Sequence, residues 1–156
     1  MRNLNSRSLA NRALIALVGL LSTVGLVWAM QSATVAVPAG DAWTATAVLT
    51  SGAEGAEVYG PGGIGTGGDD TWEWSIGIGS GGQLSINGQP AGACIPMNSH
   101  AVTVSAWRSG PNWFCDIEVR DLVTNMVRGS LDDYQMNGPT VQVTASAQTL
   151  TSLNIQ

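Results

Sequence analysis

Alternation of apolar and polar residues is the feature that most limits what this chain can fold into. Past Gly40, one face of the first such run carries Trp43, Ala45, Ala47 and Leu49, and threonines occupy the other face. Similar runs, rich in Thr, Val, Ile and Trp, recur to the C-terminus. A period of two residues is the signature of half-buried β-strands. We therefore predict an all-β fold, an antiparallel β-sandwich or jelly roll of about seven to nine strands.

Glycine-rich segments between these runs supply the turns that an antiparallel fold needs. Residues 79–82 and 109–112 read as chain reversals, and Asn87-Gly88 is a dipeptide typical of tight hairpins. Residues 51–70 lose the alternation and are predicted to form a long glycine-rich loop.

Two stretches in the C-terminal half allow more than one interpretation. Residues 119–127 fit a helical stripe or a hairpin, and the turn pair Thr124-Asn125 with β-branched neighbours favours the hairpin.

Residues 140–156 alternate without a proline or a charge. Because strands seldom exceed about ten residues, we expect a bend near residues 148–150. An uncharged strand of this kind at a sheet edge would invite strand addition from a neighbour.

The N-terminus has the layout of an export segment. Arg2, Arg7 and Arg12 precede an uncharged apolar run over residues 13–30, as in a secretory signal with cleavage after Ala29 or, alternatively, after Ala33. The run is also just long enough to stay as a signal anchor across about 30 Å of hydrocarbon. Either way we expect an extracytoplasmic protein, secreted, periplasmic or on the cell surface. Its expected divisions are a signal peptide or anchor (1–29), a linker (30–40) and a single β-sandwich domain (41–156).

Charge narrows the choice of partners. The chain has six arginines, no lysine and eleven acidic residues. Three of the arginines belong to the export segment, so the exported part carries three cations against eleven anions, a formal charge of −8. Nucleic-acid binding needs a clustered basic surface and is not expected. The expected partner is a protein (self or another surface component) or a neutral glycan, with membrane contact only through residues 13–30 if they stay uncleaved.

The two cysteines, Cys94 and Cys115, predict a structural disulfide bond, because an even number in an exported chain usually pairs. Closing a loop of about 20 residues would stabilise the fold by roughly 3 kcal/mol. Two free buried thiols are the alternative. A zinc site would be a ligand short, because the chain has a single histidine.

Aromatic residues are the candidate ligand-binding groups, since their rings stack on sugars. The tryptophans that alternate in phase with Ile and Val, and are therefore predicted to lie in the core, are Trp72, Trp74 and Trp113. Trp107 is out of phase with the apolar residues of its run and is the candidate for an exposed binding aromatic. Tyr59 and Tyr134, in neighbouring predicted loops, would assist it.

Paired acidic residues are the candidates for a metal site. Asp69-Asp70 and Asp132-Asp133 lie in predicted loops, and Ca²⁺ prefers clustered carboxylates. Solvated loop acids are the alternative, and no other cofactor is indicated. His100 is predicted to face solvent at the start of a strand, where it lacks the partners of a catalytic relay.

One segment resembles a known enzyme family. Trp72-Glu73-Trp74, followed by alternating strands and by residues 117–125, resembles the second half of the glutamic (eqolisin) peptidases. The resemblance implies a lysine-poor secreted β-sandwich in which Glu73 is the catalytic glutamate. The family's partner glutamine lies well upstream, and here the only upstream glutamine after the apolar run is Gln31, in a different context.

Three functions follow from these observations. The first is an exported, non-enzymatic β-sandwich that serves as a cell-surface or assembly component and associates through its C-terminal strand. The second is a small carbohydrate-binding module that uses Trp107. The third, implied by the family resemblance, is an acid peptidase that uses Glu73.

Overall fold

The computed structural model describes residues 30–61 and 72–156 of the chain. The predicted export segment at residues 1–29 and the calcium candidates Asp69 and Asp70 lie outside the described residues. Within the two described ranges, no helix is long and apolar enough to cross a membrane.

The described residues form eleven β-strands, more than the seven to nine predicted. Part of the difference is that β1 lies in the predicted linker and β3 in the predicted glycine-rich loop. In chain order the strands are β1 Gln31–Ala36, β2 Ala42–Thr50, β3 Ala56–Pro61, β4 Trp72–Ile78, β5 Gln83–Ile86, β6 Gln89–Ala93, β7 Ser99–Ser109, β8 Asn112–Asp121, β9 Val127–Met136, β10 Gln142–Ala147 and β11 Thr149–Ile155.

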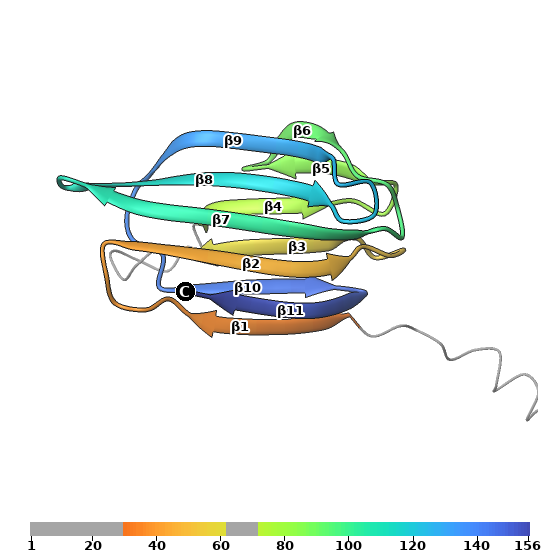
Figure 1. The fold of residues 1–156 in the computed structure, drawn as a ribbon, viewed down its shortest axis with the longest axis horizontal. Coiled ribbons are helices and arrows are strands. Elements are labelled where there is room, and N and C mark those ends of the chain that lie inside the picture. The colour runs from red at the N-terminus through yellow and green to blue at the C-terminus, as the bar shows by residue number, and fades with distance from the viewer. Residues whose placement is uncertain (1–29, 62–71) are drawn as a thin grey trace, which may run out of the picture.

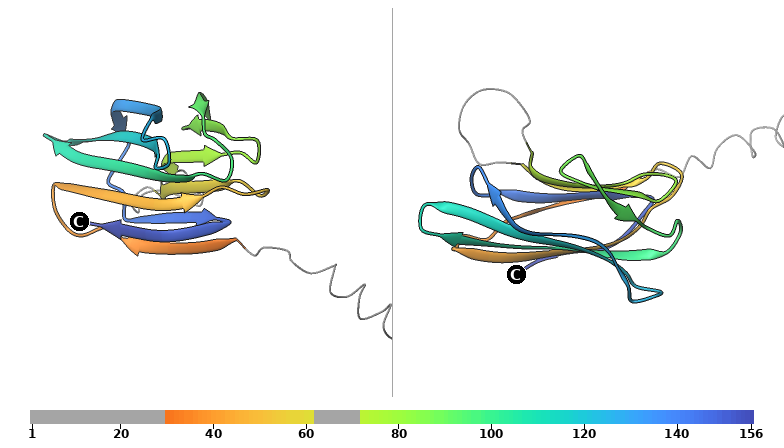
Figure 2. Two further views of the ribbon diagram at one scale, coloured as in Figure 1. Left: turned by 45° about the vertical axis from the view of Figure 1, so that its right-hand side comes forward. Right: turned by 90° about the horizontal axis from the view of Figure 1, so that it is seen from above.

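The strands make two facing antiparallel sheets, so the predicted β-sandwich is confirmed (Figures 1 and 2). Sheet A has six strands in the order β1-β10-β3-β4-β5-β6. Sheet B has five strands in the order β11-β2-β7-β8-β9. Each sheet joins parts of the chain that are far apart in sequence, as where β1 pairs with β10 along its whole length.

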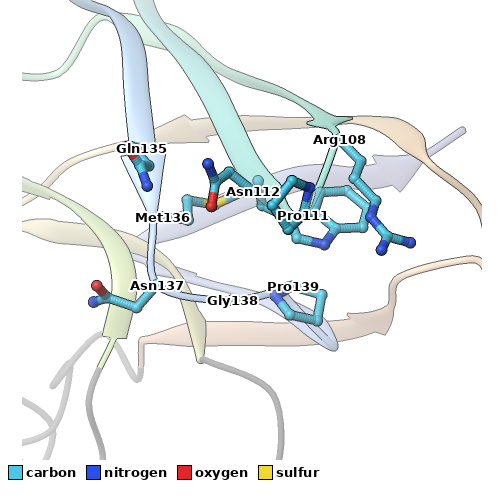
Figure 3. A pocket seen from close by; sticks show the side chains of 9 residues that line it. Arg108, Pro111, Asn112, Gln135, Met136, Asn137, Gly138 and Pro139 are labelled. Carbon is cyan, nitrogen blue, oxygen red and sulfur yellow. The ribbon is translucent and has the colours of Figure 1, made fainter.

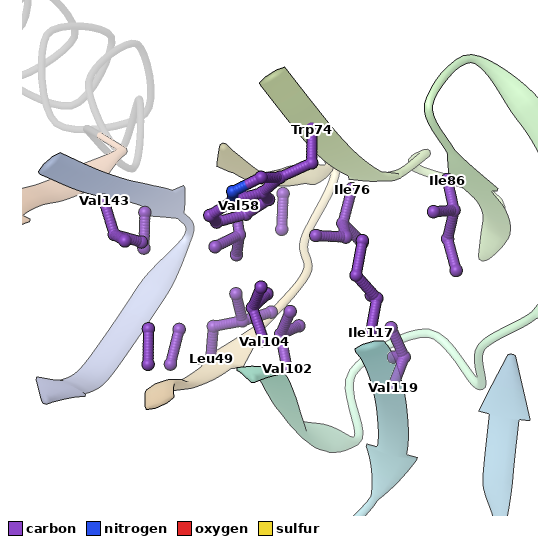
Figure 4. Close-up of a cluster of buried hydrophobic side chains, with 14 of the residues drawn as sticks. Leu49, Val58, Trp74, Ile76, Ile86, Val102, Val104, Ile117, Val119 and Val143 are labelled. Atoms are coloured by element: carbon purple, nitrogen blue, oxygen red, sulfur yellow. The ribbon is translucent and has the colours of Figure 1, made fainter. Parts of the chain in front are cut away.

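The core lies between the sheets and consists of the inward residues of the alternating strands. Leu49 on β2 and Val102 on β7 are 0% and 1% exposed. Trp43 of sheet B and Trp74 of sheet A meet across the core with ring centroids 6.3 Å apart. In Figure 4, Ile76 of sheet A points toward the inward side chains of sheet B. Burial of this apolar area is the main driving force for pairing the two sheets.

The C-terminal run bends where the sequence predicts. β10 ends at Ala147 in sheet A, and β11 begins at Thr149 in sheet B, so Gln148 carries the chain from one sheet to the other. β11 is an edge strand, but it lies beside β1, the edge strand of sheet A (Figure 1). There the Leu150 N–H donates a hydrogen bond of 2.8 Å to Gln31 Oε1. The first and last strands therefore cover each other.

Residues 119–127 contain a hairpin turn and no helix, as the residue pattern favours. β8 ends at Asp121, whose backbone N–H donates to the Met126 carbonyl over 2.9 Å, and β9 begins at Val127. Asn125 adopts a left-handed φ of 57° in the turn. Asparagine tolerates this conformation better than most residues, because its short polar side chain can hydrogen-bond locally.

The predicted disulfide bond is wrong, because Cys94 and Cys115 are free thiols buried in the core. Cys94 follows β6 in sheet A, near the charges of Asp121 and Arg128. Cys115 lies on β8 six residues before Asp121, which is about 20 Å along an extended strand. A disulfide bond tolerates a Cα separation of only about 7 Å. Sequence spacing alone does not reveal that the two thiols lie toward opposite ends of the sandwich.

Glycines allow the other two edge strands, β6 and β9, to approach closely. A Cβ atom at Gly129 of β9 would lie 2.6 Å from both the Ala91 carbonyl oxygen and Leu84 Cδ2. A Cβ atom at Gly92 of β6, where φ is +140°, would collide with the Arg128 carbonyl oxygen. Larger residues at these two positions would force the strands apart.

We expect Gly129→Ala to lower the free energy of unfolding by about 1–3 kcal/mol, because the added methyl group would overlap the backbone of β6. Gly40→Ala is the matched control, since a Cβ atom there would meet nothing nearer than 3.7 Å. Its effect should stay within about 0.5 kcal/mol. Urea unfolding measures both values. Equal stability of the two variants would contradict the close approach of β6 and β9.

Both thiols should resist modification while the protein is folded. Burial raises the pKa of Cys94 to about 11 and that of Cys115 to about 12, so little reactive thiolate is present at neutral pH. The thiol reagent DTNB should therefore react with neither cysteine in the native protein. In concentrated guanidinium without a reductant it should react with both. A need for reductant in the unfolded protein would reveal a disulfide bond.

Candidate functional site

An aromatic pair stands on the outer face of sheet B. Trp107 of β7 lies directly opposite Phe114 of β8, and their rings stack with centroids 6.1 Å apart and planes inclined by 20°. Both side chains are half-buried and alternate with the buried Ala106 and Cys115. Trp107 therefore lies outside the core, in the phase that its sequence position predicts. The pair offers an apolar surface to a ligand on the solvent side of the sheet.

A polar groove of about 510 Å³ lies on the same face, beside the aromatic pair. Ser105 and Asp116 form the next cross-strand pair on this face, and Thr103 and Glu118 form the one after it. Each step is about 7 Å along the strands. The residues that line the groove are Thr103, Ser105, Asp116, Ile117, Glu118, Val127, Ser130 and Asp132. We refer to the aromatic pair and this groove together as the sheet-B outer face.

Local hydrogen bonds hold the polar side chains of this face in place. Asp116 Oδ1 accepts a bond of 2.8 Å from the Asp133 N–H, which leaves its second carboxylate oxygen for a ligand. Glu118 Oε1 accepts a bond of 2.9 Å from Arg120 Nε. The Ser105 hydroxyl lies 3.2 Å from the hydroxyl of Thr44 on β2. Side chains positioned in this way lose less freedom when a ligand binds.

The structure does not bring the two candidate tyrosines to Trp107. Tyr59 is half-buried on β3 in sheet A, alternating with the buried Val58, and so it belongs to the outer face of the opposite sheet. Tyr134 lies on β9 opposite Cys115 and packs against the core. Phe114, which is not among the binding residues predicted from the sequence, is the actual neighbour of Trp107. Its position out of phase with Cys115 is the signal that could have found it.

The acidic pair Asp132-Asp133 is exposed on β9, where a loop was predicted. Asp132 lines the groove, and Asp133 adopts a left-handed φ of 53° that directs its N–H to Asp116. Across residues 30–61 and 72–156, no group of three or more His, Cys, Asp or Glu side chains gathers as a metal site.

Glu73, the residue singled out by the family resemblance, makes structural contacts. Its side chain is 8% exposed, and Oε2 accepts hydrogen bonds from the Asn137 N–H at 2.7 Å and the Gly138 N–H at 3.3 Å. Across sheet A, Gln31 pairs with Ala147, which is in register with Ala56 and through it with Ile78. Gln31 therefore lies at the same end of the sheet as Ile78, the last residue of β4. Glu73 lies five residues earlier on that strand, so the structure does not bring the glutamate and the upstream glutamine together.

A second groove, of about 500 Å³, opens where β7 turns into β8 (Figure 3). The side chains that line it include Arg108, Trp113, Gln135 and Asn137. The Arg108 guanidinium lies 3.6 Å from the Asp41 carboxylate, and its Nε donates to the Gly110 carbonyl over 3.0 Å. Because its cation already has a partner, this groove offers a ligand mainly neutral hydrogen-bonding groups.

His100 is buried, which corrects the prediction that it faces solvent. It is 0% exposed at the start of β7, and its Nε2 lies 3.9 Å from Oδ2 of Asp121, which is also 0% exposed. Neither ring nitrogen makes a hydrogen bond of good geometry with the described residues, although the backbone of Asn98 lies close enough to favour the protonated ring. Both residues lie in phase with the buried valines of their strands, Val102 and Val119. That phase was the available signal for a buried polar pair.

The Asp121 carboxylate is the centre of this buried cluster. Oδ2 accepts hydrogen bonds of 2.9 Å from Asn98 and from Arg128. Oδ1 accepts bonds of 2.9 Å and 3.0 Å from the N–H groups of Val123 and Thr124. Burial alone would raise the pKa of Asp121, but these donors outweigh it and hold the pKa far below its usual range. The carboxylate thus fixes the β8–β9 turn.

Solvent exposure distinguishes the buried His100–Asp121 cluster from the sheet-B outer face as candidate functional sites. The His100–Asp121 cluster is closed to solvent, so it stabilises the fold and cannot meet a ligand. The sheet-B outer face combines an open surface with an aromatic pair, carboxylates and hydroxyls. No protein-family model and no curated protein sequence matches this chain. The functional interpretation therefore depends on the geometry of this face.

Stability should fall in two stages as the pH is lowered. Burial lowers the pKa of His100 in the folded protein. Below about pH 6.5 the unfolded chain therefore binds a proton that the folded protein does not bind, and the free energy of unfolding falls. The pKa of Asp121 is also lowered, so its contribution is lost as the pH falls below about 3.9 toward its folded pKa. Urea unfolding at several pH values measures both stages.

Replacement of the histidine isolates the first stage. Because His100 is the only histidine, His100→Asn should flatten the dependence between about pH 6.5 and pH 5. The second stage should remain in this variant. A wild-type stability that does not change across the first window would contradict the burial of an uncharged histidine.

Proposed function

We propose that the exported domain is a non-enzymatic surface module that binds a neutral glycan on the sheet-B outer face. The observation that carries this proposal is the stacked Trp107–Phe114 pair beside a groove of hydroxyls and carboxylates. A sugar ring presents an apolar C–H surface that packs on aromatic rings. Its hydroxyl groups both donate and accept hydrogen bonds, which suits the carboxylates and hydroxyls of the groove.

Charge supports a neutral ligand over an acidic one. The groove is lined by Asp116, Glu118 and Asp132, and its neighbouring cation, Arg120, is already paired with Glu118. An acidic sugar would be repelled by this surface. A neutral oligosaccharide lying along β7 and β8 would place one ring on the aromatic pair and the following rings over the groove.

The other two functions have weaker support. Strand addition at β11 would require β1 to move aside, because β1 lies beside that edge and Gln31 binds the Leu150 N–H. A peptidase that uses Glu73 would need a partner glutamine, whereas Gln31 lies at the other end of sheet A. Glycan binding needs no rearrangement of the described structure.

Trp107→Ala should weaken glycan binding at least about tenfold, or about 1.4 kcal/mol, because it removes the larger ring of the stacked pair. Binding is first located on an array of neutral oligosaccharides and then measured by titration calorimetry with the tightest of them. Trp107→Phe should retain part of the affinity. Circular dichroism confirms that each variant is folded.

Tyr59→Ala is the matched control, since it removes a half-buried aromatic from the outer face of the opposite sheet. Its affinity should equal that of the wild type. Undiminished binding by Trp107→Ala, or a complete absence of binding to neutral glycans by the wild type, would overturn the proposal.

A further inference from the structure

One end of the sandwich exposes a cluster of large apolar side chains, which we call the apolar end. Its members come from the loop between β6 and β7 and from the β8–β9 turn. They are Ile95, Met97, Leu122, Val123 and Met126, which are 40%, 66%, 46%, 69% and 57% exposed. Soluble surfaces seldom gather apolar residues in this way unless they contact a partner or a membrane.

Two hydrogen bonds hold the loop and the turn against each other. Asn98 Nδ2 donates to Asp121 Oδ2, and the Leu122 N–H donates to the Ser99 carbonyl, each over 2.9 Å. Met97 adopts a left-handed φ of 68°, which costs energy for a residue with a Cβ atom. The apolar end is therefore a fixed surface whose side chains are held toward solvent.

The two segments of the apolar end contain no charged residue of their own, although the protein as a whole is acidic. The other connections at this end of the sandwich are residues 51–55, residues 79–82 and Gln148, which neighbour one another in the structure. Among these connections and the two segments of the apolar end, Glu54 is the only charged residue. The opposite end carries the exposed Arg108–Asp41 pair. Arg120 and Arg128 donate hydrogen bonds to the turn, but each is paired with a carboxylate of its own or the neighbouring strand. An apolar surface whose neighbouring cations are already paired suits contact with hydrocarbon and does not require attraction to anionic lipids.

The chain enters the sandwich at this same end. Gln31, the first residue of β1, pairs with Ala147 and binds the Leu150 N–H. Figure 1 shows the start of β1 and the β8–β9 turn at one end of the molecule. From β11 to β8 there are three strand spacings, or about 15 Å. The apolar run over residues 13–30 ends at Met30, directly before β1, so no linker separates the two.

We propose that residues 13–30 remain as a membrane anchor and that the apolar end rests on the bilayer surface from which the chain emerges. Without a linker, a spanning segment that ends at residue 30 must place the start of β1 at the membrane surface. The apolar end then faces the lipid, and Val123 and Met97 reach into its interfacial layer. The sheet-B outer face stands roughly upright on the membrane and stays open to a ligand. This arrangement does not depend on glycan binding.

Site-specific fluorescence tests the proposal on the full chain, reconstituted in phosphatidylcholine vesicles after mass spectrometry confirms that residues 1–30 are present. Val123→Cys and, in a second protein, Met97→Cys carry an environment-sensitive fluorophore. Ser109→Cys, at the exposed turn of the opposite end, is the matched control. The natural cysteines should remain unlabelled, because burial raises their pKa to about 11 and about 12.

Brominated phosphatidylcholine should quench the fluorophore at residues 123 and 97 several-fold more than at residue 109, with little dependence on salt. Equal quenching at the three positions would overturn the proposal. A blue shift at residue 123 without lipid quenching would indicate a protein partner and would overturn it as well. A mature protein that starts at residue 30 when isolated from its native host would show that the anchor is removed, with the same consequence.

Discussion

The packing of two apolar sheet faces against each other is the constraint on which the rest of this structure depends. Successive side chains of a strand point to opposite faces, so the two neighbours of every core residue point toward solvent. Val102 and Val104 point inward on β7, and the same geometry places Trp107 on the outer surface. The candidate binding site is thus a direct product of the alternation that builds the core.

Much of the fold could be predicted because this alternation is a local property of the sequence. The β-sandwich, the hairpin after β8 and the bend before β11 all follow from residue phase and turn chemistry. Strand β1 was missed because its small and polar residues resemble a linker, and its pairing with β10 becomes visible only in three dimensions. The disulfide prediction failed for a related reason, since spacing along the chain does not say where on a sheet each cysteine falls.

The site was predictable in part. The phase of Trp107 indicated an outward aromatic, but its partner Phe114 and the groove depend on the register between β7 and β8, which the sequence does not display. The buried pair of His100 and Asp121 was missed because polar residues at strand ends are usually solvated. Here several donors around one carboxylate make burial possible, since each oxygen of Asp121 accepts two hydrogen bonds.

The pairing of β1 with β10 also determines when the domain can become complete. β1 is the first strand of the described residues, and its partner strand is separated from it by more than a hundred residues. A chain crossing a membrane from its N-terminus would deliver β1 first and leave it without a partner until nearly the whole domain had emerged. Contacts of such long sequence separation form late and slowly. For a chain exported as its N-terminal residues predict, sheet A would therefore close only at the end of translocation.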